Sequence, residues 1–293
     1  MGSSRWDPDA WTSYTKTTTT KTRDAIFTTR GMKDYLNPLG VAIRESRDSA
    51  ANPESNAIIV GIDVTGSMGM IAEAIAREGL GVLFQEVLDR KPVSDPHLMF
   101  MAIGDANCDS APLQVSQFEA DDKIITQLTD IYLEGGGGGN NFESYNLPWY
   151  FAATHTSIDC FEKRGKKGYI FTVGDEFPAS DLTIAQIKAV VGDTLTQPLS
   201  NAELLTMVSR MYNVFHVIVE EGSCARSRLK EVTSAWKDVL GQNVLSLSDY
   251  RRLSEVIVSA IQVCEGSNKA DVVKSWSGDT ALVVSRAIGS MTT

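Results

Sequence analysis

Short apolar runs and longer segments of helical spacing alternate along this chain. An apolar run of about four to eight residues is typical of a strand buried on both faces, as in a parallel sheet. Apolar residues that recur every three or four positions predict a helix with one buried face. Because the two patterns alternate, the chain is predicted to form a doubly wound α/β sheet. The predicted strands are 57–63, 98–104, 113–118, 168–173, 212–219 and 243–247, and the predicted helices are 71–90, 121–131, 145–151, 183–192, 202–210, 226–240 and 249–264.

The two ends of the chain do not show this pattern. Residues 1–50 predict an irregular N-terminal arm, in which Trp6, Trp11 and Tyr14 precede a threonine-rich run. Such an arm either lies across the domain, stays flexible, or becomes ordered on a partner. A charge cluster at 44–49 is either a solvated loop or pairs with acidic groups near a site. We therefore expect one main domain at 51–266 and a C-terminal extension at 267–293, with a short helix near 281–288 that packs on the domain or on a neighbour.

The first predicted strand ends in a group of oxygen-bearing side chains. Asp63, Thr65 and Ser67 follow the run Ile-Ile-Val-Gly-Ile and precede a helix. In open α/β sheets, ligands bind outside the carboxyl ends of the strands. A carboxylate and two hydroxyls are hard ligands that suit Mg²⁺ or Mn²⁺, which keep several waters. The alternative is that Asp63 only caps the helix and the two hydroxyls belong to a turn.

Two later segments also lie next to predicted helices or strands. One is a glycine run before a predicted helix, and the other is the turn that follows a predicted strand. Five glycines at 135–139 precede Asn140 and Asn141, and glycines let the backbone approach a ligand closely. The strand at 168–173 leads into Gly-Asp175-Glu176. Asp175 is expected across the cleft from Asp63, because their strands flank the point where the strand order reverses.

Together, these three segments resemble the metal-ion-dependent adhesion site (MIDAS) of von Willebrand factor A (vWA) domains, over roughly residues 55–265. The resemblance implies a six-stranded, mostly parallel Rossmann-like sheet with one antiparallel edge strand and helices on both faces. It implies that Asp63, Thr65, Ser67 and Asp175 hold one Mg²⁺ or Mn²⁺. The family's usual threonine after the glycines is replaced here by Asn140 or Asn141, whose amide oxygen can also bind a hard cation. Glu143 is the alternative, directly or through water.

The resemblance also implies a function. In vWA domains the ion keeps an open position that a partner's carboxylate fills, so the predicted function is metal-dependent protein–protein interaction with a partner that presents an acidic residue. Intracellular vWA proteins often act in multiprotein assemblies, some with ring ATPases of the MoxR type of AAA+ proteins.

Composition narrows the classes of partner. The chain has 293 residues, 43% of them hydrophobic, and a net charge of −10. An acidic chain argues against nucleic-acid binding, which needs a basic surface. It has no apolar run of about 18 residues for a membrane span and no secretory signal at its start. Its four cysteines are far apart, which favours reduced thiols and a cytoplasmic location.

Enzymatic motifs are lacking in the sequence. It contains no G-x-S-x-G elbow, no P-loop and no G-x-G-x-x-G fingerprint after a strand. We therefore expect a binding module and not an enzyme. Two alternatives stay open: a metal-dependent hydrolase that also uses Asp105, Asp109 and Glu176, and a structural component of an assembly whose site is vestigial.

Overall fold

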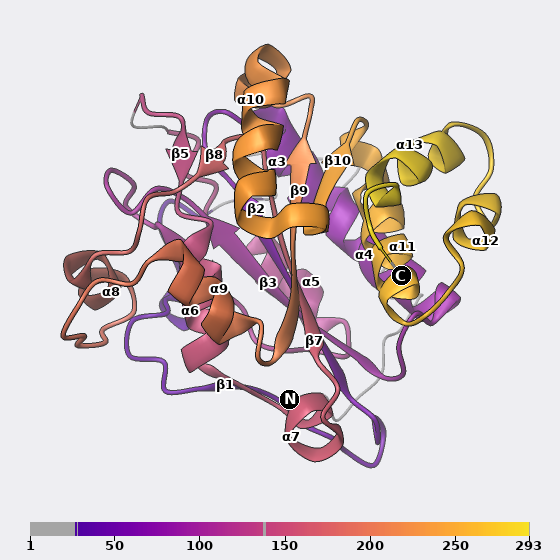
Figure 1. The fold of residues 1–293 in the computed structure, drawn as a ribbon. Helices are drawn as coiled ribbons and strands as arrows, with labels where there is room; N and C mark the ends of the chain where they lie inside the picture. Colours follow the sequence, from indigo (N-terminus) through magenta and orange to yellow (C-terminus); the bar gives the residue numbers. More distant parts are fainter. Residues whose placement is uncertain (1–26, 28, 137–138, 293) are drawn as a thin grey trace.

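The structure, a computed structural model, describes residues 27, 29–136 and 139–292. Trp6, Trp11 and Tyr14 therefore lie outside the described residues. Within them, a central sheet of six strands runs in the order β10-β9-β7-β2-β3-β4 (Figure 1). All neighbouring strands are parallel except β3 and β4, which form an antiparallel pair at one edge. This confirms the predicted fold class. The strands are β2 Asn56–Asp63, β3 Pro96–Ile103, β4 Leu113–Val115, β7 Gly168–Gly174, β9 Tyr212–Val219 and β10 Val244–Leu247.

The edge strand β4 is shorter than the alternating pattern at 113–118 predicts. It ends at Val115. Beyond it, the N–H of Ser116 still donates to the carbonyl of Phe100 at 2.9 Å, but the N–H of Phe100 donates to Oγ of Ser116 at 2.8 Å. Pairing with β3 returns only as an isolated bridge between Glu119 and Leu98. The hydroxyl of Ser116 thus takes the place of a backbone carbonyl in the ladder, and regular pairing ends there.

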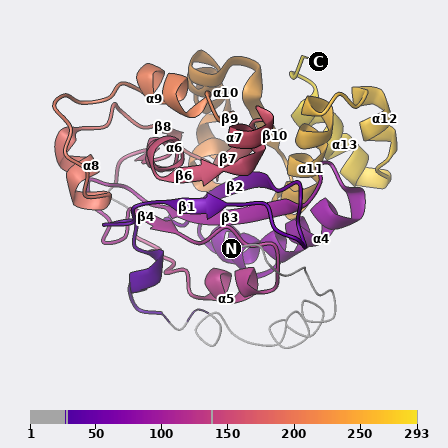
Figure 2. The same ribbon diagram turned by 90° about the horizontal axis from the view of Figure 1, so that it is seen from below.

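Helices cover both faces of the sheet, and Figure 2 shows the two layers. Along β2, Ile58, Val60 and Ile62 pack on one face with α4, α5 and α11. Ala57 and Ile59 point to the other face, among α6, α9 and α10. This alternation is the period of two that a strand imposes on its side chains. The helices are α3 Met70–Ala74, α4 Leu80–Arg90, α5 Lys123–Thr129, α6 Asn146–Thr154, α7 Asp159–Arg164, α8 Ile184–Val190, α9 Asn201–Val208, α10 Ser223–Leu240, α11 Leu253–Cys264, α12 Lys269–Lys274 and α13 Gly278–Ile288.

The predicted helix at 71–90 is not one regular α-helix. A π-helical turn, Ile75–Gly79, separates α3 from α4. Glycine is a poor helix former, and the wide turn ends at one. None of the helices in the described part of the chain is long and apolar enough to cross a membrane.

The segments that flank the main domain also pack on it. Arg44–Ser46 forms strand β1, which pairs in parallel with β6, Thr156–Ile158. Arg47 then pairs with Asp159 at 2.8 Å. These charges lie near the amino end of β2, because Arg164 of the same helix α7 donates to the carbonyl of Ser55. The charge cluster therefore lies at the end of β2 opposite Asp63.

The described residues of the C-terminal extension form two helices, of which the sequence predicted one. Asn268, expected in a polar link, instead accepts hydrogen bonds from the N–H groups of Ala270 and Asp271 and caps α12. Helix α13 follows and buries Val284 and Ile288 in the core layer of α11. The extension thus completes one face of the domain.

Candidate metal centre

Strand β2 carries Asp63 to the carboxyl edge of the sheet. All eight residues of β2 are buried, and Asp63 is 0% exposed. Its Oδ1 accepts hydrogen bonds from the backbone N–H and the hydroxyl of Thr65, at 2.9 and 2.7 Å. Asp63 and Thr65 are therefore held together by two hydrogen bonds in the turn that follows β2.

The third residue of the motif connects to the neighbouring strand. Oγ of Ser67 donates to Oδ1 of Asp175 at 2.7 Å, and it lies 3.4 Å from Oγ1 of Thr65. Oδ2 of Asp175 accepts from the N–H of Cys224 at the start of α10, at 2.8 Å. Asp63 and Asp175 face each other because β2 and β7 are adjacent in the sheet. The structure thus joins four of the six residues predicted from sequence in one hydrogen-bonded cluster.

The glycine run packs against the first loop. The N–H of Gly66 donates to the carbonyl of Gly136 at 2.6 Å, and the N–H of Gly135 donates to the carbonyl of Val64 at 3.2 Å. A Cβ atom on Gly66 would lie 2.8 Å from the same carbonyl of Gly136. Gly66 therefore allows the two loops to approach at this distance.

Asn140 and Asn141 lie beside this cluster but do not bond to it. Nδ2 of Asn140 donates to Oδ2 of Asp105 at 2.5 Å. The carbonyl of Asn141 accepts from the N–H of Phe177 at 3.1 Å. Both asparagines line an open hollow of about 580 Å³, which we call the upper hollow. Its lining also includes Gly66, Ser67, Gly135, Gly136, Gly139, Glu176, Ser223, Cys224 and Ser227.

The sequence reasoning missed the role of Tyr145, which it treated only as an aromatic residue of a helix. Its hydroxyl donates to Oδ2 of Asp63 at 2.7 Å. Its ring meets His216 and Trp236 edge-on, and these two stack with their ring centroids 3.5 Å apart. His216 is buried, as a core residue, with Nδ1 2.9 Å from Oγ1 of Thr172. A tyrosine just after the glycine run, at the start of α6, was the available signal.

Two further acidic side chains are buried beside the cluster. Glu143 and Glu176 are 3% and 6% exposed, and Oε2 of each has no hydrogen-bond partner among the described residues. Burial, together with repulsion from Asp63, raises the pKa of Glu143 to about 10 and that of Glu176 to about 8. Burial likewise raises the pKa of Asp63 to about 7, against the hydrogen bonds from Thr65. Negative charge here is poorly solvated and poorly compensated.

This donor set fits a hard cation. The hydroxyls of Thr65 and Ser67 donate hydrogen bonds to carboxylates, so the lone pairs of the two hydroxyl oxygens stay available to a metal. The unpartnered oxygens of Glu143 and Glu176 add two acceptors that lack a counter-charge. In the described part of the chain, no group of three or more His, Cys, Asp or Glu side chains could hold a metal by itself. A cation here would therefore depend on the hydroxyl oxygens.

Two of the carboxylates assigned to the hydrolase alternative, Asp105 and Asp109, already accept hydrogen bonds from the loop that follows β3. Oδ2 of Asp109 accepts from the N–H of Asp105 at 2.7 Å. Oδ1 of Asp105 accepts from the backbone and the side chain of Asn107. This loop follows β3, which lies on the opposite side of β2 from β7.

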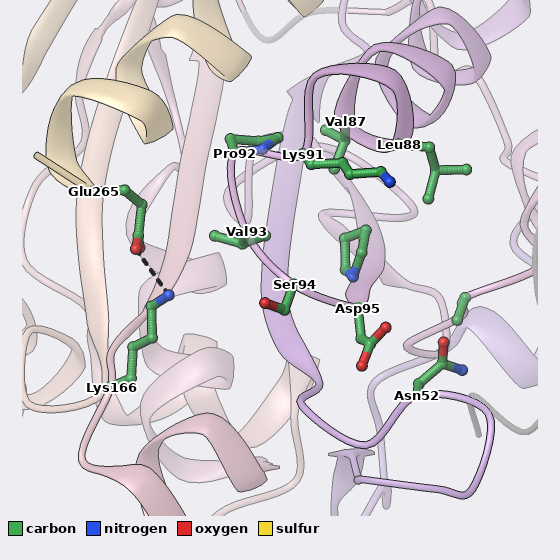
Figure 3. Close-up of a pocket in the computed structure, with 12 residues that line it drawn as sticks. Asn52, Val87, Leu88, Lys91, Pro92, Val93, Ser94, Asp95, Lys166 and Glu265 are labelled. Carbon is green, nitrogen blue, oxygen red and sulfur yellow. Dashed lines mark ion pairs between the residues drawn. The ribbon is translucent and has the colours of Figure 1, made fainter. Parts of the chain in front are cut away.

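Another hollow, of about 570 Å³, lies at the amino ends of β2 and β3. Figure 3 shows Lys166 and Glu265, paired at 2.8 Å, on one side, and Asn52 and Asp95 on the other. Since β2 has eight residues, this hollow is about 25 Å from Asp63. It contains none of the predicted site residues.

Comparison with known proteins gives distant structural likenesses. No family model and no curated protein matches this chain. Among solved structures, it is similar to the pilus adhesin SpaC from Lactobacillus rhamnosus GG in its open conformation, with a TM-score of 0.47, 8% identity, and coverage of 78% of this chain and 31% of that one. It is also similar to a von Willebrand factor type A protein from Catenulispora acidiphila, with a TM-score of 0.38, 14% identity, and coverage of 73% and 44%. The chain thus spans less than half the length of either, and scores this low carry no argument about function.

Proposed function

We propose that this chain is a metal-dependent protein–protein interaction module of the vWA type. One observation carries the proposal. Asp63, Thr65 and Ser67 meet Asp175 in a single cluster at the carboxyl edge of two adjacent parallel strands. That is the position at which open α/β sheets bind ligands. The alternative in which these residues only cap a helix is disfavoured, because Asp63 makes no cap to α3, whose N-cap is Gly69.

Each residue has a distinct task in the proposed site. Thr65 and Ser67 offer hydroxyl oxygens to Mg²⁺ or Mn²⁺, while Asp63 and Asp175 orient those hydroxyls by accepting hydrogen bonds from them. Asn140, Asn141 or Glu143 completes the shell from the loop side. A bound divalent cation supplies positive charge that attracts an acidic side chain of a partner. The upper hollow gives that side chain a route to Ser67.

The partner is proposed from its chemistry. It presents a carboxylate, and it belongs to a multiprotein assembly in the cytoplasm, for which a MoxR-type AAA+ ATPase is one candidate by family resemblance. Nucleic acid and membranes are not proposed as partners, because the net charge of −10 repels the phosphates of both.

A metal-dependent hydrolase is the second candidate. It is favoured by the unpartnered oxygens of Glu143 and Glu176, which add carboxylates to the cleft. Such an enzyme would hold a second ion within about 4 Å of the first, with Glu176, Asp105 or Asp109 as ligands. Anomalous scattering from crystals soaked in Mn²⁺ counts the ions: one peak supports the binding module, and two bridged peaks support the hydrolase.

Isothermal titration of the chelated protein with Mg²⁺ tests the proposed function directly. The native chain should bind one ion, and Asp63→Ala should abolish binding without changing the circular-dichroism spectrum. Asp159→Ala is the matched control, because Asp159 is also a buried carboxylate but lies near the amino end of β2. Undiminished affinity in Asp63→Ala would overturn the assignment, and so would an equal loss in the control. No titration heat in the native chain would favour the vestigial alternative.

A further inference from the structure

A third hollow, of about 440 Å³, lies farther along α10. We call it the basic hollow. Helix α10 forms one wall, β10 contributes Ser246, and α13 contributes Arg286. In Figure 1, β10 lies between α10 and α13. Its other lining residues are Glu220, Leu229, Lys230, Thr233, Ser234 and Lys237.

The charge of this hollow differs from that of the chain. Among the described residues, Lys230 and Lys237 take part in no ion pair, while Arg286 pairs with Glu220 at 2.7 Å. Three cations against one carboxylate leave the lining with two positive charges, although the chain carries −10. An anionic group is therefore attracted to this part of an otherwise acidic surface.

One face of α10 connects the basic hollow to the upper hollow. Five exposed residues of α10 follow one another at intervals of four, three, four and three, and we call them the stripe: Ser223, Ser227, Lys230, Ser234 and Lys237. Beyond the kink at Arg228, that spacing places Lys230, Ser234 and Lys237 on one face of the helix. The two serines at 223 and 227 line the upper hollow, and the last three residues line the basic hollow.

The acidic residues of α10 flank this stripe along one side. Glu231 and Asp238 follow Ser227 and Ser234 by four positions each, which turns them about 40° around the axis. Glu231 is moreover paired with Arg228 at 2.6 Å. The backbone of Arg228 is non-helical, with φ −134° and ψ 31°. This kink separates the two serines that line the upper hollow from the three residues that line the basic hollow.

We propose that this face of α10 is the docking surface for an acidic, extended segment of the protein partner. The inference rests on the proposed function: one carboxylate of the segment enters the upper hollow toward the metal, and others reach Lys230 and Lys237. From Ser227 to Lys237 the helix rises about 15 Å, which an extended strand covers in about five residues. The partner segment therefore carries acidic residues about five positions apart.

Charge favours a peptide over a nucleic acid. Two unpaired lysines neutralise few phosphates, and the surrounding charge of −10 repels a long polyanion. Ser234, which lies between the two lysines, adds a hydroxyl donor that suits a carboxylate.

The test uses the full chain and fluorescein-labelled deca-glutamate in Mg²⁺, with binding followed by fluorescence anisotropy. Lys230→Glu/Lys237→Glu should weaken binding about tenfold or more, since each reversal replaces an attraction with a repulsion. Lys188→Glu/Lys274→Glu is the control: these two lysines are also exposed, lie on α8 and α12, and change the net charge equally. The control should stay within about twofold of the native chain.

Other probes separate this inference from the proposed function. Tri-glutamate, which is too short to span both hollows, should bind more weakly than deca-glutamate to the native chain and should not respond to the lysine reversals. If Mg²⁺ binds but the reversals and the control have equal effects, the docking surface is wrong and the metal site stands. If the native chain binds no Mg²⁺, the proposed function is wrong, and the docking surface that rests on it is wrong as well. Tighter binding of a ten-residue oligothymidylate than of deca-glutamate would overturn the preference for a peptide.

Discussion

The hydroxyl of Tyr145 donates a 2.7 Å hydrogen bond to Oδ2 of Asp63, from a position 82 residues farther along the chain. Both side chains are fully buried. Because Oδ1 of Asp63 already accepts two hydrogen bonds from Thr65, Tyr145 fixes the remaining oxygen and with it the orientation of the carboxylate. Hydrogen bonds of this kind, made to metal-site residues from outside the ligand shell, commonly tune metal affinity.

We therefore expect Tyr145→Phe to weaken Mg²⁺ binding by about tenfold or more, measured by isothermal titration. The matched control is Tyr212→Phe. Tyr212 is also fully buried, and its hydroxyl makes a 2.7 Å hydrogen bond to Thr156, away from the site. Both variants should lose about 1 kcal/mol or more of unfolding free energy, but only Tyr145→Phe should lose metal affinity. Equal affinities in the two variants would show that Tyr145 has only a packing role.

Gly174→Ala should displace Tyr145. A Cβ atom at position 174 would lie 2.0 Å from the tyrosine hydroxyl, and a fully buried ring has no space into which to move. Overpacking of this kind costs about 1 to 3 kcal/mol, so the midpoint of urea unfolding should fall, and Mg²⁺ affinity should fall with it. Gly31→Ala is the control, because a Cβ there meets nothing within 4 Å. A Gly174→Ala protein with native stability would contradict the close approach.

Acid should destabilise the fold through His97. Burial lowers its pKa from the ordinary 6.5 to about 4, although Asp48, Asp95 and Asp121 act in the opposite direction. Between pH 6.5 and pH 4, His97 is protonated in the unfolded chain but stays neutral in the folded chain. The stabilisation is therefore complete above pH 6.5 and is lost as the pH falls toward 4, by an amount on the order of 3 kcal/mol.

The measurement is the difference in unfolding free energy between the native chain and His97→Asn, at pH 7 and at pH 4.5. Taking this difference cancels the contributions of the buried carboxyls and of His216, which both proteins share. The native chain should lose more stability than the variant over this interval. Parallel losses in the two proteins would contradict the assignment.

The C-terminal helix α13 should contribute to the stability of the domain. Ile288 is 1% exposed and belongs to the core layer of α11, whereas Leu282 on the same helix is 71% exposed. Ile288→Ala should cost about 2 to 4 kcal/mol of unfolding free energy, and Leu282→Ala less than about 0.5 kcal/mol. Denaturant unfolding of both variants measures this. Similar values would mean that α13 is only loosely attached.

Local pattern predicted the sheet well. The buried apolar runs gave five of the six strands of the central sheet, since a strand buried on both faces needs apolar residues on both. The alternating run at 113–118 gave the edge strand but not its end, because the hydroxyl of Ser116 replaces a backbone acceptor of the ladder there. The pairing of β1 with β6 had no signal in either strand, since each is three residues long and without an apolar run.

The sequence alone determined which residues follow the carboxyl ends of the strands. A run of β-branched residues that stops at Asp63 is sufficient to place that carboxylate at the edge of a sheet, and the same holds for Asp175. Tertiary structure alone decided that Tyr145 binds Asp63, that Asn140 bonds to Asp105, and that Glu143 and Glu176 are buried beside the cluster. Those facts depend on contacts between segments that are far apart in the chain. Periodicity reports which face of its own element a residue occupies, and it carries no information about which side chain of another element it will meet.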